Sequence, residues 1–179
     1  MKEAKHMKAL WLLKHDASVA SGPLTEAMPD ASVMQSWRAI EGPWTYVYAP
    51  GNLDLQVHCA APGVSCHRLQ CVQMLDGASA GADAPFHYVV ETDVLAGQEA
   101  ELEAWYAQEH LPGLASVPGT VRAARYLDAA GSPRFYACYD LVSPETLGSA
   151  AWLAVRGTAW SAKVRPAFRN TRRTMFRGA

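Results

Sequence analysis

A weak internal repeat with a spacing of 77 residues limits the folds that this chain can adopt. Residues 11–16 (Trp-Leu-Leu-Lys-His-Asp) resemble residues 88–93 (Tyr-Val-Val-Glu-Thr-Asp), and residues 40–42 (Ile-Glu-Gly) resemble residues 117–119 (Val-Pro-Gly). Each glycine is followed by a strand-like run, a turn and a second strand-like run. Because two separate segments share one spacing, we expect the chain to consist of two related halves.

The second half predicts the element order β-α-β-β-α-β, which is the ferredoxin-like plan. Pro112 and Gly113 should end its first helix, and Ser143 with Pro144 should begin its second. The expected strands are 86–94, 121–127, 134–141 and 170–177, and the expected helical segments are 98–111, 143–155 and 158–164.

The first half is shorter. We expect a strand at 7–14, a helix within 24–38, a hairpin formed by 44–49 and 53–60, and a last strand at 66–75. This leaves no room for a second helix. The small residues of 77–85 form a linker, so the predicted division is a degenerate ferredoxin-like half over 1–76 and a complete one over 86–179.

The composition agrees with two sheets that face each other. A ferredoxin-like sheet has helices on one face only, so two such units can pack their open faces together and enclose a cavity. Half of the residues are hydrophobic and 18% are charged, against about 25% in an average globular chain. This excludes a disordered chain. The predicted fold is therefore α+β, with two tandem units packed as one intramolecular barrel.

Neither a nucleic acid nor a membrane is an expected partner. The formal net charge is −1, and the apolar run 9–13 is only five residues long, whereas a membrane-spanning helix needs roughly 20. The five arginines of 165–177 are interpreted as charges that protect an edge strand. We expect a monomer or a homodimer.

The four cysteines are Cys59, Cys66, Cys71 and Cys138, and none forms a Cys-x-x-Cys pair. If 55–60 and 66–75 are strands, neighbouring side chains point to opposite faces, so one metal ion cannot collect them. We therefore expect no metal site and buried free thiols in a reducing cytoplasm.

The predicted helix 98–111 carries the densest group of candidate functional residues. Glu109 should lie among Leu102 and Trp105, where apolar surroundings would raise its pKa and suit it to carry a proton. His110 should lie at the helix C-terminus, where the helix dipole favours its charged form. The alternatives are that the aromatic residues are core, that an arginine such as Arg125 holds Glu109, and that His110 caps carbonyls.

This segment resembles the dimeric α/β barrel proteins. The resemblance rests on Trp105-Tyr106-x-x-Glu109-His110-Leu111-Pro112, followed by Val117-Pro118-Gly119 and Ala124-Arg125-Tyr126. EthD-related proteins carry a similar helix, and the superfamily includes antibiotic-biosynthesis monooxygenases, muconolactone isomerase and haem-handling relatives. The resemblance implies a ligand pocket inside the barrel with the histidine near its mouth. Residues 32–35 of the first half contain no acid or histidine, so we expect one site per chain.

Two strands add further candidates. The repeat relates Lys14 to Glu91 and Asp16 to Asp93. If their shared face looks into the barrel, Lys14 and Glu91 form an ion pair across it or bind a ligand; if not, they lie in water at strand ends. Tyr136 lies on one face of its strand. That face either lines a pocket or is exposed to solvent at an edge.

The predicted function is binding of a small apolar or aromatic oxygenated molecule without a cofactor, and conversion of that molecule by proton transfer, lyase or monooxygenase chemistry is left open. His110 would be the acid or base, assisted by Glu109 or Asp93. The predicted ligand contacts are Trp105, Tyr106, Glu91, Lys14, Arg125 and Tyr136. The alternatives are a non-catalytic structural or assembly protein and a haem-binding relative.

Overall fold

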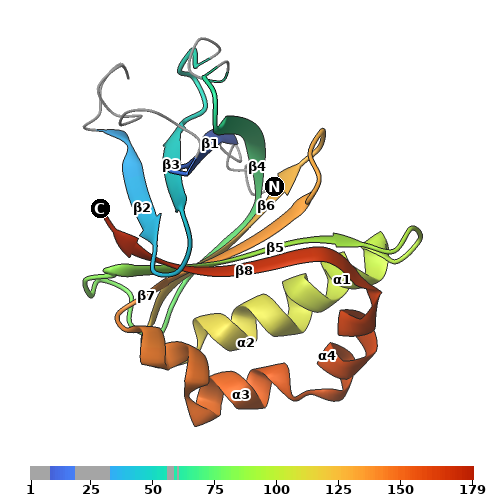
Figure 1. Ribbon diagram of the computed structural model, residues 1–179. Helices are drawn as coiled ribbons and strands as arrows, with labels where there is room; N and C mark the ends of the chain where they lie inside the picture. Colours follow the sequence, from blue (N-terminus) through green and yellow to red (C-terminus); the bar gives the residue numbers. More distant parts are fainter. Residues whose placement is uncertain (1–8, 19–32, 56–58, 60) are drawn as a thin grey trace, which may run out of the picture.

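The computed structural model describes residues 9–18, 33–55, 59 and 61–179, and its strands close into a barrel (Figure 1). The fold is α+β. The strands are β1 (Ala9–Asp16), β2 (Gln35–Ala39), β3 (Trp44–Pro50), β4 (Val64–Asp76), β5 (Phe86–Val94), β6 (Thr120–Asp128), β7 (Phe135–Leu141) and β8 (Phe168–Gly178).

Around the barrel the strands follow the order β1-β3-β2-β8-β5-β7-β6-β4, and every neighbouring pair is antiparallel. The four strands of each half are neighbours, in the order fourth, first, third, second. The β2–β8 and β4–β6 pairs join the two halves. One chain therefore closes the barrel, while the division of the chain into units at 77–85 stays a prediction.

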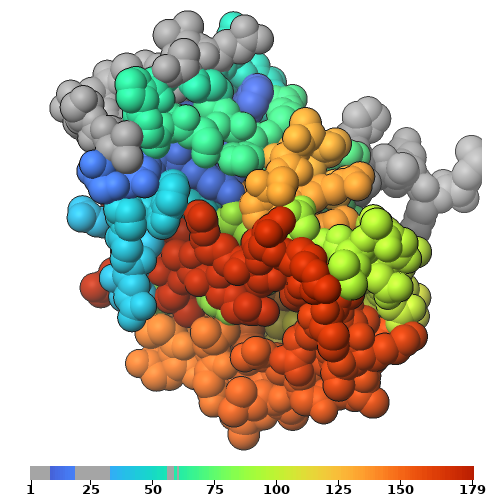
Figure 2. Space-filling model, turned by 45° about the vertical axis from the view of Figure 1, so that its right-hand side comes forward, coloured from blue at the N-terminus to red at the C-terminus, as the bar shows by residue number. Residues whose placement is uncertain are grey.

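The described helices lie against the outer face of the β5–β8 sheet, below the barrel in Figure 1. In the space-filling view, the blue and blue-green surface of the first half and the orange helical surface lie on opposite sides of the red surface that includes β8 (Figure 2). The helices are α1 (Glu99–Trp105), the π-helix η4 (Tyr106–His110), α2 (Leu111–Ala115), the 3-10 helix η5 (Pro144–Gly148), α3 (Ala150–Arg156), α4 (Ala159–Val164) and the 3-10 helix η6 (Arg165–Ala167).

The sequence predicts that the first helix ends at Leu111, but in the structure the helix continues to Ala115. The π turn η4 precedes Pro112, and the amide of Leu111 donates to the carbonyl of Tyr106, five residues earlier. Pro112 then falls in the first turn of α2, where a missing amide is tolerated. The π turn allows the chain to remain helical through a residue that normally ends a helix.

Ser143 caps the next helical segment as predicted, since its side chain accepts from the amide of Glu145. The segment is divided, however, into η5 and α3, and Ser149 caps α3. The predicted bounds of β5 agree with the structure, and those of β6, β7, β8 and α4 differ from it by at most two residues at either end.

The predicted hairpin of the first half is wrong. Arg38 lies in β2, not in a helix, and β2 forms the hairpin with β3, while residues 53–55 are not a strand. Residues 35–37 of the predicted helix also lie in β2, and residues 24–32 lie outside the described residues. In β1–β3 Tyr48 pairs with Leu12, as Cys138 pairs with Val89 in β5–β7. The spacing of 77 therefore holds for the first strands and becomes 90 (138 − 48) at the third.

Buried side chains occupy the inside of the barrel, where a ligand cavity was expected. Leu12 and Val89 lie there at equivalent positions of the two halves. The other buried residues of this inner core are Trp37, Ala39, Tyr46, Tyr48, Leu69, Ala124, Tyr126, Tyr136, Cys138 and Phe176.

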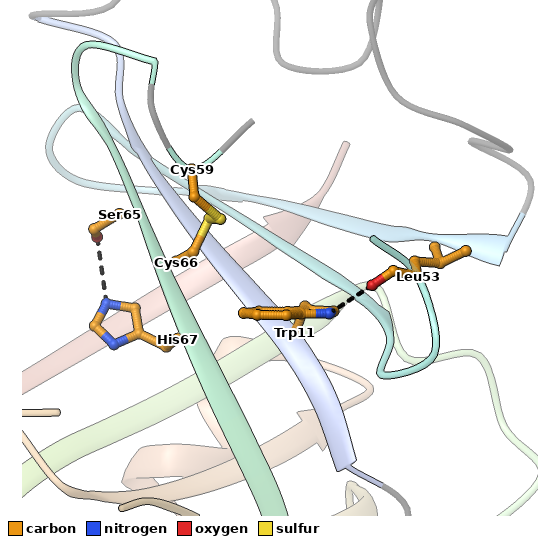
Figure 3. The surroundings of a disulfide bond; sticks show 6 residues. All are labelled: Trp11, Leu53, Cys59, Ser65, Cys66 and His67. Atoms are coloured by element: carbon orange, nitrogen blue, oxygen red, sulfur yellow. Dashed lines mark hydrogen bonds between the residues drawn. A yellow bond between two sulfur atoms is a disulfide. The ribbon is translucent and has the colours of Figure 1, made fainter. Parts of the chain in front are cut away.

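On the other side of the first-half strands, the described residues form a small core of Leu13, Val47, Ala49 and Leu55, with a disulfide beside it (Figure 3). A disulfide joins Cys59 to Cys66, and Trp11 Nε1 donates to the carbonyl of Leu53 at 3.0 Å. The prediction of free thiols is wrong for these two cysteines, because residues 53–55 are not a strand and Cys59 lies beside Cys66 of β4. Cys71 and Cys138 are free.

The disulfide removes the argument for a reducing cytoplasm, because such bonds persist in oxidising compartments. The cytoplasmic location therefore stays a prediction without that support. None of the described helices is long and apolar enough to cross a membrane.

Candidate functional site

His110 lies between the helices and the sheet, not inside the barrel. Its side chain is buried, with the ring stacked on Trp105 at a centroid distance of 4.0 Å and edge-on to Tyr106 at 5.4 Å. Within the described part of the chain, its Nδ1 has no hydrogen-bond partner. Such an atom is unusual, since buried polar groups are nearly always paired.

The pKa of His110 is lowered to about 3, because burial removes water and because Arg165 and Arg156 repel a charged imidazole. The sequence predicted the opposite, a charged histidine at a helix end. That prediction is wrong because the helix continues through α2, so His110 is not in its last turn. The imidazole is therefore neutral at physiological pH.

A cavity of about 30 Å³, enough for roughly one water molecule, lies beside His110 between the helices and the β5–β8 sheet. Its walls are aromatic and its charged members are all arginines. The lining residues are Tyr88, Val90, Trp105, Tyr106, His110, Leu114, Tyr139, Trp152, Arg156, Arg165, Phe168 and Arg173.

Two more lining residues carry buried nitrogens for which the described residues offer no partner. These are the indole Nε1 atoms of Trp105 and Trp152, both of which are N–H donors. The cavity wall thus contains two free donors and, in neutral His110, a nitrogen that either donates or accepts according to its tautomer. These hydrogen-bonding groups suit a ligand with oxygen atoms.

The other predicted residues on the helical side of the sheet have structural contacts. Glu109 accepts a hydrogen bond from Thr158 Oγ1 at 2.6 Å and so joins the π turn to the start of α4. Arg125, predicted to bind ligand, donates to Glu103 at 2.6 Å, and its guanidinium lies 4.5 Å from the ring centre of Tyr106. Arg125 therefore supports the aromatic wall from behind.

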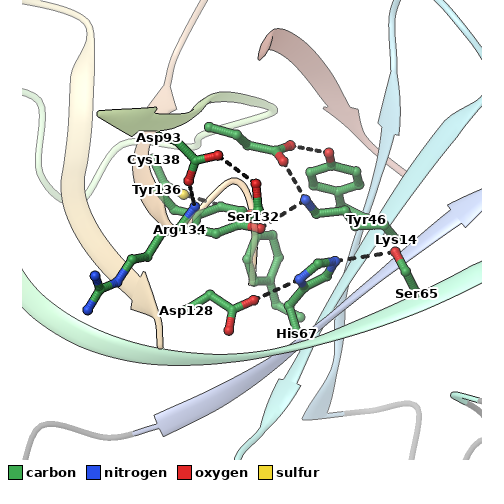
Figure 4. A network of polar contacts seen from close by, with 12 residues as sticks. Lys14, Tyr46, Ser65, His67, Asp93, Asp128, Ser132, Arg134, Tyr136 and Cys138 are labelled. Atoms are coloured by element: carbon green, nitrogen blue, oxygen red, sulfur yellow. Dashed lines mark hydrogen bonds and ion pairs between the residues drawn. The ribbon is translucent and has the colours of Figure 1, made fainter. Parts of the chain in front are cut away.

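A second set of predicted residues lies inside the barrel (Figure 4). Lys14 forms an ion pair with Glu91, and both side chains are buried. Tyr46 donates to the other carboxylate oxygen of Glu91, and Lys14 donates to Tyr136 Oη at 3.0 Å. The ion pair expected from the repeat is present, and the alternative of strand ends in water is wrong. Each half supplies one charge and one tyrosine, and each group bonds to the other half.

Asp93 lies at the end of β5 and holds the loop between β6 and β7. Its carboxylate accepts from Ser132 Oγ at 2.6 Å, from the amide of Arg134 at 2.8 Å and from Asn170 Nδ2 at 3.0 Å. Partial burial raises the pKa of Asp93, but these hydrogen bonds outweigh burial and hold it below its usual value. Asp93 therefore has structural partners of its own and makes no contact with His110.

The predicted site is thus divided between the two faces of the sheet. His110, Glu109, Trp105, Tyr106 and Arg125 lie on the helical side, while the ion pair and Tyr136 lie inside the barrel. The structure does not assemble the predicted group of His110, Glu109 and Asp93. Among the described residues, no cluster of three or more His, Cys, Asp or Glu side chains could hold a metal ion.

Sequence reasoning missed the cavity residues contributed by the sheet and by α3. Arg165 and Arg173 were interpreted as charges of an edge strand, but β8 pairs with β2 on one side and with β5 on the other. The only signal for these cavity residues in the sequence was the arginine-rich tail itself. That signal does not show that the tail packs against α3, because this packing depends on contacts between residues far apart in the chain.

A larger hollow, of about 380 Å³, lies at one end of the barrel beside the 77–85 segment. Its lining includes Arg122 and Asp140, which pair with each other at 2.6 Å, and Asp140 also bonds to His87 at 2.6 Å. Arg122, Asp140 and His87 therefore satisfy one another, while Trp37 Nε1 in the same lining has no partner among the described residues.

No protein-family model matches the chain, and no curated protein matches it. Solved structures do resemble it over nearly its full length. A protein from Fusobacterium nucleatum whose name gives monooxygenase as a provisional function has a TM-score of 0.62 at 10% identity and covers 97% of this chain and 93% of its own. A ferredoxin-fold protein from Listeria monocytogenes, related to antibiotic biosynthesis monooxygenases, has a TM-score of 0.58 at 9% identity and covers 99% of both chains. The chain therefore shares the fold of these proteins, a ferredoxin fold whose strands here close into a barrel.

A third structure, of a major regulator of staphylococcal pathogenesis, has a TM-score of 0.63 at 8% identity and covers 96% of this chain and 99% of its own. Proteins with different roles thus share this barrel, so function must be argued from the site. The resemblance to EthD-related proteins in particular stays a prediction.

Proposed function

We propose that the chain binds a small aromatic molecule carrying a hydroxyl group in the cavity beside His110. The observation that carries this proposal is the buried Nδ1 of His110, which has no partner among the described residues, in a ring that stacks on Trp105 and lines the cavity. A ligand hydroxyl that donates to this atom would remove the cost of an unsatisfied polar group, which is about 1–3 kcal/mol.

The neutral state of His110 suits this role, because only a neutral imidazole has a nitrogen free to accept. With a pKa of about 3 it is a weak base, and burial and the two arginines are the causes. Acceptance of a hydrogen bond is therefore its first role, and proton transfer would follow only where the bound molecule changes that pKa.

Room for an aromatic ring requires outward movement of part of the helical layer, since a cavity that binds benzene measures about 150 Å³. The segment best suited to move is α3 with α4. Both helices are short, and they bury only Trp152, Ser161 and Val164. A porphyrin is far larger than this cavity, so nothing in its size favours the haem-binding alternative.

The proposal is tested by titrating the protein with p-cresol and with toluene, which lacks the hydroxyl, and following tryptophan fluorescence. We expect saturable binding of p-cresol and a preference for p-cresol over toluene. In His110→Phe, which keeps the stacked ring but removes the acceptor, this preference should fall about fivefold, as for loss of one hydrogen bond of ~1 kcal/mol. If neither compound binds, the non-catalytic assembly role is favoured instead.

A further inference from the structure

We infer that Arg156, Arg165 and Arg173 form an anion-binding subsite at the same cavity, so that its aromatic ligand carries a carboxylate as well as a hydroxyl group. This inference rests on the proposed function and names its ligand class. The three arginines come from different elements, the end of α3, the start of η6 and the middle of β8, and all three line the cavity.

None of the three arginines forms an ion pair with a described carboxylate. Two other arginines that pack beside this sheet do form ion pairs, Arg122 with Asp140 and Arg125 with Glu103. Arg165 is instead held in place by carbonyl groups: its Nε donates to Ser161 at 3.2 Å and its Nη2 to Arg156 at 2.8 Å. Its charge is therefore positioned but not neutralised.

The three charges repel one another. The pKa of Arg165 is lowered by burial and by the nearby Arg156 and Arg173. Holding cations together without a counterion costs free energy, and a bound carboxylate would offset this cost through charge-assisted hydrogen bonds. Arginine is also well suited to bind carboxylates, because its planar group can donate two parallel hydrogen bonds.

The position of the subsite sets the kind of molecule that fits. The same cavity is lined by Tyr88, Trp105 and Trp152, which suit the faces and edges of an aromatic ring. A hydroxybenzoate-like molecule places a carboxylate at one end of the ring and a hydroxyl at the other. The same cavity then supplies cations for one group and His110 for the other.

Anion binding would also change His110. Arg165 and Arg156 are among the causes that lower its pKa, so neutralising them with a carboxylate raises that pKa. The bound ligand would thereby make the histidine a better acceptor for the proton of its own hydroxyl group.

The experiment compares 4-hydroxybenzoate with its methyl ester, which keeps the ring and hydroxyl but has no charge, in the full chain at neutral pH. We expect the acid to bind at least tenfold more tightly than the ester and its affinity to fall with rising salt. Arg173→Gln and Arg156→Gln should each abolish most of this preference. The matched control is Arg177→Gln. Arg177 is exposed like Arg173 and lies in the same strand but does not line the cavity, so this variant should retain the preference.

Equal binding of acid and ester to the unaltered chain would overturn the anion subsite and leave the proposed function standing. Failure of p-cresol, ester and acid alike would overturn both. As an independent measurement, the NMR titration of His110 should move to higher pH in the presence of 4-hydroxybenzoate, and no movement on saturation would also contradict the subsite.

Discussion

Lys14 and Glu91 occupy equivalent positions of the repeat and neutralise each other at the centre of the barrel. Removing one member of a buried pair leaves an uncompensated charge, whereas replacing both by apolar groups is often tolerated. We expect Lys14→Met to lower the free energy of unfolding by about 3–5 kcal/mol, and the double change Lys14→Met/Glu91→Leu to lower it by less. Urea denaturation of the two variants measures this. The exposed pair Lys163–Glu101 gives a control, Lys163→Met, which should cost under about 1 kcal/mol.

His110 gives a prediction about pH. Its pKa is about 3 in the folded protein and about 6.5 in an unfolded chain. Between these values the unfolded state binds a proton that the folded state does not, so stability falls as pH falls, by about 1.4 kcal/mol per unit. From pH 7 to pH 5 the contribution is ~2 kcal/mol. Denaturation at both pH values measures this. Between pH 7 and pH 5 the free energy of unfolding should fall less for His110→Gln than for the unaltered chain, by that amount. Equal decreases in the two proteins would contradict the buried neutral state.

At the residue scale, the sequence predicted the partner of Lys14 because the repeat relates the two positions directly. It did not predict the surroundings of His110. Pro112 and Gly113 indicated a helix end, and only the π turn before them shows why the helix continues. The arginines around His110 come from segments at least 46 residues away (156 − 110), which no local pattern connects to it.

At the scale of elements, the strands of the second half were predictable because alternating residues bounded by turns define them well. The first half was not, because 35–39, 44–50 and 53–60 are all short runs with turn residues between them. Either neighbouring pair could form the hairpin. The choice of β2 with β3 follows from closure of the barrel, in which β2 must also pair with β8.

The contact between α2 and α3 depends on Gly113. A Cβ atom at this position would lie 2.8 Å from Cγ1 and 3.2 Å from Cγ2 of Val155. We expect Gly113→Ala to lower the free energy of unfolding by about 1–3 kcal/mol through overpacking, although alanine favours a helix. In a Val155→Ala background the same change should be neutral or stabilising. Gly148→Ala is the control, since nothing lies within 4 Å of its Cβ position; equal costs in both backgrounds would exclude overpacking as the cause.

At the scale of the whole molecule, the two sheets share an inner core but differ on their outer faces. Helices cover the second sheet and leave the cavity at His110, whereas the described cover of the first sheet is the loop held by the Cys59–Cys66 disulfide. The expectation of one site per chain stays a prediction. Buried apolar residues lie on both faces of each sheet, which explains the high apolar fraction of the chain.

Two strand pairs, β2–β8 and β4–β6, are the seams at which the two halves join, and they differ in length. Three residue pairs join β2 to β8, from Trp37–Gly178 to Ala39–Phe176, while seven join β4 to β6. Because fewer bonds must break to separate β2 from β8, this seam should open at a lower free energy than the whole molecule unfolds. Hydrogen exchange followed by NMR should show faster exchange for the amides of β2 than for those of β6 paired with β4. Phe176→Ala, which removes a fully buried side chain at this seam, should speed exchange in β2 more than in β6, and equal protection at both seams would show that the barrel opens only as a unit.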